Sequence, residues 1–408
     1  MNNKKVCLFA ITLYFTNFCF ASEFDLKWDW IVSTQTSSTQ KNTFNSLNEG
    51  QQQSINGVLD VEINYGELTG SFALKGNDIY HSDNNQKSEA EFIISELFWL
   101  DSISIAQYEL DLQFGKSRID WGVGYGYRPL DIFSTYRRNP VGIQIEEGVG
   151  VAALSYFDLL GEWTFIYTNS TLNNQKSSNI EEENEQQGLG IRRYGMINNT
   201  EYQSLIYYDD VRRGLIAGSL VTVIDNAWEF HGSAVYQQRF LSYQQGEYTL
   251  EIKEQNGAYQ ALLGLTWTDI LGNTLIAEYW YDSRAWDRQT WDKAINEGSP
   301  VYQQGYLHRN IVQHNIMLHW QLDSSAWQNW QWSQGSLLDK LTPSIDLLYS
   351  PADNGLIATQ WLSYLLNDSA DSQSELQLAA RFFTGKAESA YANLPEKHTI
   401  LLNFKGRF

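Results

Sequence analysis

The chain ends with the stretch His398-Thr-Ile-Leu-Leu-Asn-Phe-Lys-Gly-Arg-Phe408. Successive side chains of an extended strand point to opposite faces, so Ile400, Leu402, Phe404 and Phe408 lie on one face. The other face is mostly polar. This period of two predicts a β-strand with one apolar and one polar side.

The same alternation recurs in many segments of about ten residues. Strands are predicted near 24–36, 56–66, 70–81, 91–101, 107–119, 147–158, 162–170, 189–198, 201–210, 214–225, 227–240, 258–270, 273–284, 309–322, 341–350, 356–367, 374–385 and 398–408. This is about 18 strands, and an even count fits a barrel whose two termini lie on the periplasmic side. A count of 16 also fits, because the connection from Asp323 to Lys340 is long for a periplasmic turn.

A soluble β-sandwich would show the same alternation, and three features favour a membrane barrel over it. The apolar faces become aromatic towards the strand ends, as in interfacial girdles. Short turns alternate with long polar loops, which is the pattern of periplasmic turns and extracellular loops. Finally, the terminal strand with Phe404 and Phe408 resembles the closing strand of Gram-negative outer-membrane β-barrels, whose terminal Phe belongs to the signal read by the barrel-assembly machinery. Gly406 departs from this resemblance, since an aromatic residue often stands there.

The first 21 residues are typical of a cleaved signal peptide. Met1–Lys5 is positively charged, Val6–Phe18 is apolar, and Cys19-Phe20-Ala21 provides small residues for cleavage before Ser22. The sequence therefore predicts export to the outer membrane of a Gram-negative cell, with residues 22–408 forming one all-β transmembrane barrel. Both cysteines, Cys7 and Cys19, lie in the segment to be removed, so the remaining chain has no thiol for a disulfide or a metal site.

The net charge excludes one class of partner. The chain has 28 basic and 48 acidic residues, a net charge of −20, and removal of Lys4 and Lys5 leaves −22. Such an acidic protein has no electrostatic attraction for nucleic acid. We expect outer-membrane lipid and lipopolysaccharide as its surroundings, and the alternation fits a monomer and a trimer equally well.

The most informative segment is the loop 120–146, which follows the fifth predicted strand. It begins Asp120-Trp-Gly-Val-Gly-Tyr-Gly-Tyr-Arg-Pro-Leu-Asp-Ile-Phe133, where glycines permit tight turns and proline fixes φ, so we expect an ordered loop. In and next to it lie four basic residues: Arg118, Arg128, Arg137 and Arg138. The run also loosely resembles the glycine- and aromatic-rich segment of alginate-export-type barrels, which implies an 18-stranded monomeric conduit with an arginine-lined lumen.

Two interpretations of these arginines stay open. If the loop folds inward, the arginines form a basic pore constriction that faces an acidic lumen wall, and the opposed charges filter polar solutes. The wall residues expected from the alternation are Asp60, Glu62, Glu109, Asp111, Glu229, Glu278 and Glu375. Alternatively, the arginines only pair with Asp120, Asp131, Glu146 and Glu147 and pin the loop.

Other candidate sites are weaker. Glu181–Glu185 could gather a hard cation but is more typical of a solvated loop tip. His308, His314 and His319 have spacings that split them between strand faces, so we expect no metal site. Trp286 and Trp291 could stack on sugars or pack a loop onto its neighbours.

Taken together, the sequence predicts a non-enzymatic outer-membrane channel without a cofactor or catalytic residue. It would let small hydrophilic solutes diffuse passively through a charge filter, with the loop 120–146 as constriction. One alternative is an export conduit for a secreted polymer, with the Asp323–Lys340 connection as a candidate lid. The other is a barrel for adhesion or envelope structure that transports nothing.

Overall fold

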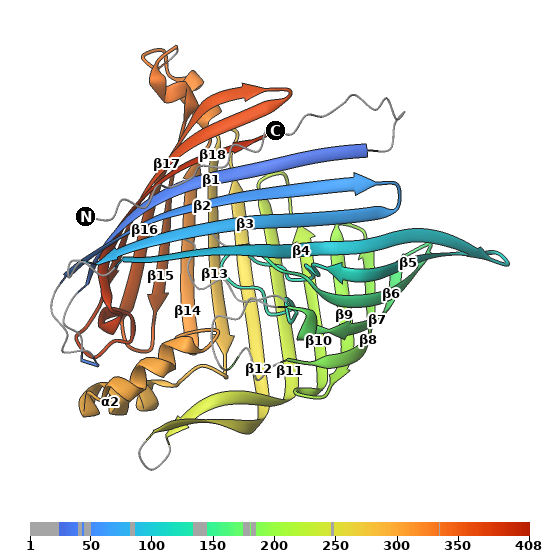
Figure 1. The fold of residues 1–408 in the computed structure, drawn as a ribbon, viewed down its shortest axis with the longest axis horizontal. Coiled ribbons are helices and arrows are strands. Elements are labelled where there is room, and N and C mark those ends of the chain that lie inside the picture. Colours follow the sequence, from blue (N-terminus) through green and yellow to red (C-terminus); the bar gives the residue numbers. More distant parts are fainter. Residues whose placement is uncertain are drawn as a thin grey trace, which may run out of the picture.

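A computed structural model shows a closed, antiparallel, 18-stranded β-barrel (Figure 1). The structure describes residues 24–39, 43–44, 50–81, 86–133, 145–173, 180, 185–245, 249–333 and 335–408. The expected signal peptide, Arg137, Arg138 and most of Glu181–Glu185 lie outside these residues.

The strands follow one another around the barrel in chain order. They are β1 (Phe24–Thr39), β2 (Gly50–Tyr65), β3 (Leu68–His81), β4 (Gln86–Ile105), β5 (Tyr108–Ser117), β6 (Val149–Asp158), β7 (Gly161–Asn169), β8 (Gln187–Ile197), β9 (Thr200–Asp209), β10 (Arg213–Val223), β11 (Trp228–Gln245), β12 (Leu250–Thr268), β13 (Asn273–Asp282), β14 (His314–Leu322), β15 (Leu341–Ser350), β16 (Gly355–Ser369), β17 (Ser372–Thr384) and β18 (Glu396–Arg407). The predicted count of 18 is confirmed, and the alternative of 16 is wrong.

Pairing between the first and last strands closes the barrel. β1 runs antiparallel to β18, from Asp29 opposite Arg407 to Thr39 opposite Glu396. Trp28 and Phe408 exchange both backbone hydrogen bonds, of 3.1 and 3.0 Å. Closure leaves no exposed sheet edge, which is the condition for a β-structure to cross a bilayer.

The structure explains why residue 406 is glycine and not the aromatic residue that often stands at this position in similar closing strands. A Cβ atom at this position would lie 2.7 Å from ring atoms of Trp30 on the neighbouring strand. Trp30 also packs edge-on against Phe404, with ring centroids 4.6 Å apart. The aromatic group near the end of the barrel is thus supplied by β1 rather than by β18.

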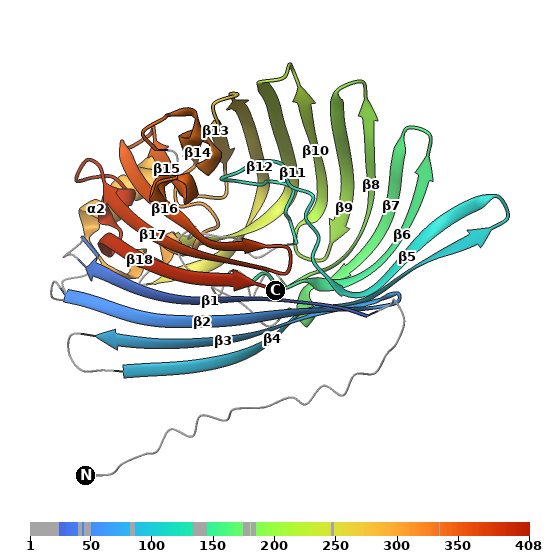
Figure 2. The same cartoon turned by 90° about the horizontal axis from the view of Figure 1, so that it is seen from above.

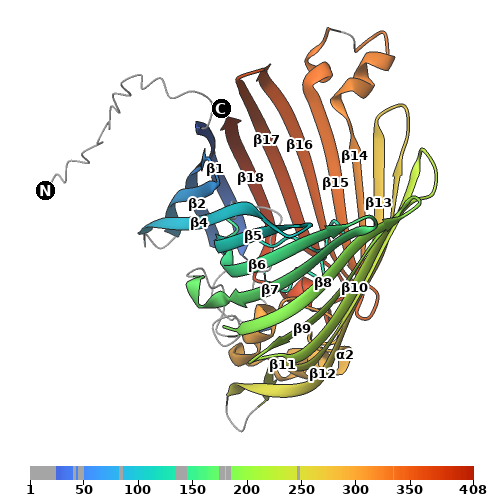
Figure 3. The same cartoon turned by 90° about the vertical axis from the view of Figure 1, so that its right-hand side faces the viewer.

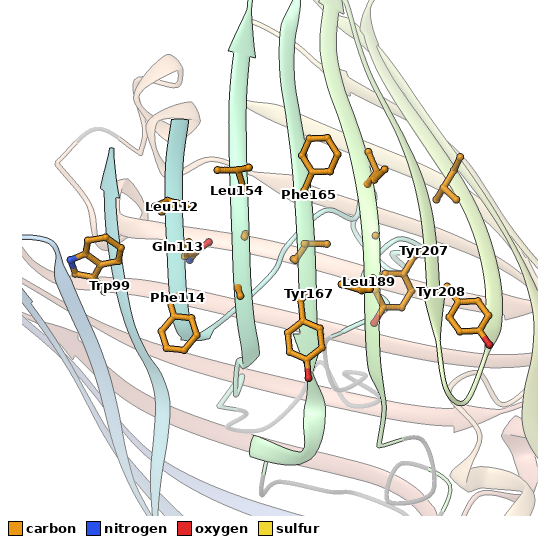
Figure 4. Close-up of a pocket in the computed structure, with 16 residues that line it drawn as sticks. Trp99, Leu112, Gln113, Phe114, Leu154, Phe165, Tyr167, Leu189, Tyr207 and Tyr208 are labelled. Carbon is orange, nitrogen blue, oxygen red and sulfur yellow. The ribbon is translucent and has the colours of Figure 1, made fainter. Parts of the chain in front are cut away.

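The outward faces form an apolar belt. Large side chains on it are strongly exposed, for example Phe114 at 68% and Ile206 at 67%. Aromatic rings gather at the end with the short turns, including Trp28 beside Phe408, Tyr108 beside Tyr156 and Trp228 beside Trp267. Figure 4 shows a second aromatic row near the opposite end, where Phe114, Tyr167 and Tyr208 lie at a similar level on the outer wall. A belt between two aromatic rows is the outer surface of a membrane-spanning barrel.

Several strands extend further than the sequence predicted. The loop expected at 241–257 is mostly a continuation of β11 and β12, which pair as far as Gln245 and Leu250. β2 starts at Gly50 instead of residue 56, and β4 runs from Gln86 to Ile105. Where strands project beyond the membrane, both faces meet water, so the alternation that marks a membrane strand disappears.

The extracellular connections share a hydrophobic core of their own. After β13 the chain forms the helix α2 (Arg288–Glu297), capped by Asp287, and the 3-10 helix η2 (Pro300–Leu307). Trp286 and Trp291 are 5% and 1% exposed and pack with Phe44, Tyr306 and Tyr391 from three other segments. The interpretation of these tryptophans as loop-packing residues is therefore the one that holds, and neither is free to stack on a sugar.

The Asp323–Lys340 connection lies at the other end of the barrel (Figures 1 and 3). It contains the 3-10 helices η3 (Ser324–Asn329) and η4 (Leu337–Lys340). It projects from the rim beside β14 and β15, and the indole N–H of Trp327 donates to the backbone of Leu341 over 2.7 Å. Within the described residues no helix is both long and apolar enough to cross a membrane.

Candidate pore and its inward loop

The segment that follows β5 lies inside the barrel. In Figure 2 this teal segment leaves β5 and runs through the interior towards β12 and β13. Its apolar residues Ile119, Leu130, Ile132 and Phe133 are buried, and they pack against the inner face of the wall from β6 to β11. Residues of that wall in the contact are Val149, Val151, Ile166, Leu205, Tyr207, Leu215, Ala217 and Val235. This explains why inward positions there are apolar, although a water-filled lumen predicts polar ones.

The tip of the loop is bound to the wall formed by β11–β15. Glu278 on β13 accepts the backbone N–H groups of Tyr125 (2.6 Å) and Gly126 (2.8 Å). The Tyr127 hydroxyl lies 2.8 Å from Gln260 and 3.0 Å from Asp282. Burial raises the pKa of this hydroxyl, so it keeps its proton and donates a hydrogen bond. The ring of Tyr125 lies against the His319 imidazole, with centroids 4.4 Å apart.

Two of the loop glycines are required by close approach. Gly124 has φ of +116°, a region that side chains rarely adopt, and a Cβ atom there would lie 2.4 Å from Leu262. A Cβ atom on Gly126 would lie 2.4 Å from the sulfur of Met317. The glycines expected to allow a tight turn thus also let the loop backbone approach the wall side chains closely, and a larger residue at either position would collide with them.

The two predicted arginines that the structure describes are both paired with carboxylates. Arg128 contacts Asp120 at 2.8 Å and Asp131 at 3.8 Å, which is the pairing expected if arginines pin the loop. Arg118 instead pairs with Glu96 on β4 at 2.5 Å, which was not among the expected partners. Glu147, another expected partner, forms an ion pair with Lys116.

Other arginines hold the loop from elements distant in the sequence. Arg212, after β9, donates to the carbonyl oxygen of Ile132 over 2.7 Å. Arg309, after η2, donates to that of Asp131 over 2.5 Å. Arg192 on β8 lies over the ring of Trp121, 5.1 Å from its centroid. No local motif marks these residues, because only closure of the barrel brings them to the loop.

Asp131 is a loop carboxyl with a raised pKa. Burial and the nearby Asp120 raise the pKa of Asp131 to about 6, against the opposing effects of the Gly122 N–H and Arg128. Its Oδ1 accepts the Gly122 N–H over 2.6 Å. The carboxyl therefore helps to fix the turn that starts the loop.

All seven predicted wall carboxylates lie on inward-facing strand positions, next to residues of the apolar belt. Asp60 and Glu62 on β2 pair with Asp29 and Lys27 on β1, so these four side chains share the inward face. Glu278 is 2% exposed and bound to the loop, and Glu375 pairs with Lys405 at 3.1 Å. For the remaining five, Asp60, Glu62, Glu109, Asp111 and Glu229, the described residues include no Lys or Arg in an ion pair with them.

A polar cavity of about 450 Å³ separates the loop from the wall on the opposite side. From the wall it is lined by Asp29, Asp60, Glu375, Lys405 and Arg407, and from the loop side by Arg118 and Glu146. The loop is thus attached to one half of the wall and leaves space along the half that contains β1, β2, β17 and β18.

The hollow drawn in Figure 4 belongs to the outer surface rather than to the lumen. It has a volume of about 700 Å³ and is lined by apolar belt residues such as Phe114, Phe165 and Leu189. Small residues, including Ala152 and Gly190, create the depression between these large side chains. Its position in the belt places it outside the lumen, so it is no part of the candidate pore.

The closed barrel, its apolar belt and its inward loop define the fold of a porin-like outer-membrane β-barrel. Solved structures with the same fold include OccK8 (OprE) of Pseudomonas aeruginosa, with a TM-score of 0.53, 11% identity and coverage of 94% of this chain and 98% of that one. OccAB1 of Acinetobacter baumannii has a TM-score of 0.54, 7% identity and coverage of 94% and 96%. OccK7 (OpdD) of P. aeruginosa has a TM-score of 0.53, 8% identity and coverage of 95% and 99%.

At these identities the likeness establishes the fold alone. No protein-family model matches the sequence, and no curated protein does.

Proposed function

We propose that the protein is an outer-membrane channel for the passive diffusion of small hydrophilic solutes, with the loop 120–146 as its constriction. One observation carries this proposal: a loop is fixed inside an 18-stranded barrel against one half of the wall, and a polar cavity lies along the other half. A barrel of this strand number is too wide for its wall side chains to fill. An inward loop in such a barrel limits the size of the solutes that pass.

The same proposal includes the route to the membrane. Residues 1–21 would be cleaved as a signal peptide in a Gram-negative cell, and the barrel-assembly machinery would recognise the terminal strand with Phe404 and Phe408. Lipopolysaccharide would surround the extracellular half of the belt.

The charge filter that we propose favours cations. Arg118 and Arg128 are expected constriction residues, but a carboxylate balances each of them. Five wall carboxylates have no such ion pair among the described residues. Fixed negative charge along a narrow aqueous path raises the local concentration of cations. Arg137 and Arg138 belong to the predicted constriction, and the reversal potential across a salt gradient measures their contribution together with that of the wall carboxylates.

Swelling of liposomes that contain the refolded protein tests the proposal. In isosmotic solutions of neutral sugars of increasing size, we expect swelling rates that fall steeply with solute size. Liposomes without protein serve as the control. Equal rates with and without folded protein for even the smallest sugar would refute a diffusion channel.

A further inference from the structure

One buried carboxylate of the lumen wall, Glu278, contacts the loop rather than the open space. Glu278 is 2% exposed, and both of its oxygens accept backbone N–H groups from the loop tip. The third donor is His231, whose Nε2 lies 2.9 Å from Oε1 of Glu278. A buried carboxylate needs such donors, so the loop and Glu278 satisfy each other.

The two strands next to Glu278 leave room for its contact with His231. His231 on β11 and Glu278 on β13 flank Gly264 on β12, in one row across the three strands. A Cβ atom on Gly264 would lie 2.1 Å from Nε2 of His231. The missing side chain thus allows the imidazole to cross β12 and reach the carboxylate.

A second carboxylate of β13 holds the next part of the tip. Asp282 lies four residues after Glu278, on the same face, and is fully buried. It lies 3.0 Å from the Tyr127 hydroxyl, and Arg284 (2.7 Å) and Asn310 (2.8 Å) donate to its Oδ2. The two carboxylates therefore bind three consecutive loop residues, from 125 to 127.

We propose that Glu278 is a positioning residue that sets the open cross-section of the pore by holding the loop tip against β13. This inference rests on the proposed channel function and adds a residue to it. Glu278 was expected to act as part of the acidic wall, whereas its contacts give it a mechanical role. Elsewhere in the loop, Ile119, Leu130 and Ile132 pack on the apolar inner face of β6–β11. Loss of Glu278 therefore releases the tip and leaves this packing in place.

Single-channel recording of Glu278→Gln tests this role. Each carboxylate oxygen accepts one loop N–H, and the amide replaces one of these oxygens by an NH2 group, which donates and so cannot accept that N–H. We expect a several-fold higher conductance, more open-channel noise, and swelling with larger sugars than the wild type admits. Glu251→Gln is the matched control, because Glu251 lies near the start of β12, beyond the membrane-spanning part of that strand, and its ion pair is with Lys253 rather than with the loop.

A disulfide separates the positioning role from a general structural one. Gly126 and Met317 are adjacent, and Met317→Cys removes the sulfur and methyl group that a Cβ atom on residue 126 would meet. The pair Gly126→Cys and Met317→Cys can therefore tie the tip to β14. In the Glu278→Gln background, oxidation should restore the wild-type conductance and reduction should raise it again. A folded Glu278→Gln barrel with wild-type conductance and noise would overturn the role of Glu278. So would a high conductance that the disulfide leaves unchanged.

If Glu278→Gln does not fold, Tyr127→Phe replaces it, since this change removes only the hydroxyl held by Asp282 and Gln260. We then expect a smaller rise in conductance and noise. Unchanged values would overturn the proposal that the carboxylates of β13 set the conductance by holding the loop tip. A wild-type barrel that conducts no ions would instead refute the channel function itself.

Discussion

Removal of two wall charges should lower the cation preference of the pore. Asp60 and Glu62 lie on the inward face of β2, and each accepts a hydrogen bond from a neutral side chain, Ser71 and Asn64 respectively. The variant Asp60→Asn/Glu62→Gln keeps the size of both side chains and removes two negative charges. Neither charge forms an ion pair with Lys or Arg within the described residues, so the change leaves no unpaired base.

The expected size of the effect follows from Coulomb's law. A monovalent cation that passes about 6 Å from one carboxylate in water gains about 0.7 kcal/mol. Screening at 0.15 M salt, with a Debye length of about 8 Å, reduces this to about 0.3 kcal/mol. Each carboxylate then raises the local cation concentration about 1.7-fold and lowers that of anions by about the same factor. Two carboxylates therefore change the cation-to-anion permeability ratio by up to about ninefold.

The assay is the reversal potential of single channels across a KCl gradient. We expect cation preference in the wild type and a clear decrease in the variant at 0.15 M salt. At 1 M salt the Debye length is about 3 Å, so each carboxylate should change the ratio by only about 1.4-fold. Asp78→Asn is the control, because Asp78 stands opposite the outward-facing Ile55. An anion-selective wild type, or a variant with unchanged selectivity at low salt, would refute the charge assignment.

Three further predictions concern assembly, pH and the extracellular core. Gly406→Phe should block folding, seen as loss of the heat-resistant band in gel electrophoresis, whereas Trp30→Ala/Gly406→Phe should recover it; equal folding of both variants would contradict the packing account. The pKa of Asp131 is raised to about 6, so the folded protein binds this proton at a higher pH than the unfolded chain does. The stability of the fold therefore increases as the pH falls through about 6, and the gain levels off below the pKa of the unfolded chain. Melting in detergent should therefore improve less between pH 7 and pH 4 in Asp131→Asn than in the wild type, and identical shifts would argue against the raised pKa. Trp291→Ala should cost about 3–5 kcal/mol locally and expose the extracellular segments to protease while the barrel stays folded; unchanged protection would contradict a shared core.

The barrel was predictable because the membrane imposes one rule on every strand. Lipid outside and polar groups inside give a period of two, and this was enough to count 18 strands and to place most of their centres. Ends were harder, because β11 and β12 continue beyond the lipid, where both faces meet water. Gly406 illustrates another limit: its reason is Trp30, and the two residues meet only when the first and last strands pair.

The inward loop was only half predictable. Its glycines and prolines indicated an ordered segment after the fifth strand, and the structure places that segment inside the barrel. Its partners could not be read from the sequence, because Glu278, Arg212 and Arg309 lie far along the chain. Partners that are near in the sequence also compete with more distant ones, as Arg118 shows by pairing with Glu96.

The most direct test of the central claim is the single-channel conductance of the refolded protein in a planar lipid bilayer. We expect discrete, stable opening steps that persist at low voltage and carry mainly cations. A barrel shown to be folded by its heat-resistant mobility, yet with no steps above the leak of the bare bilayer, would contradict a diffusion channel.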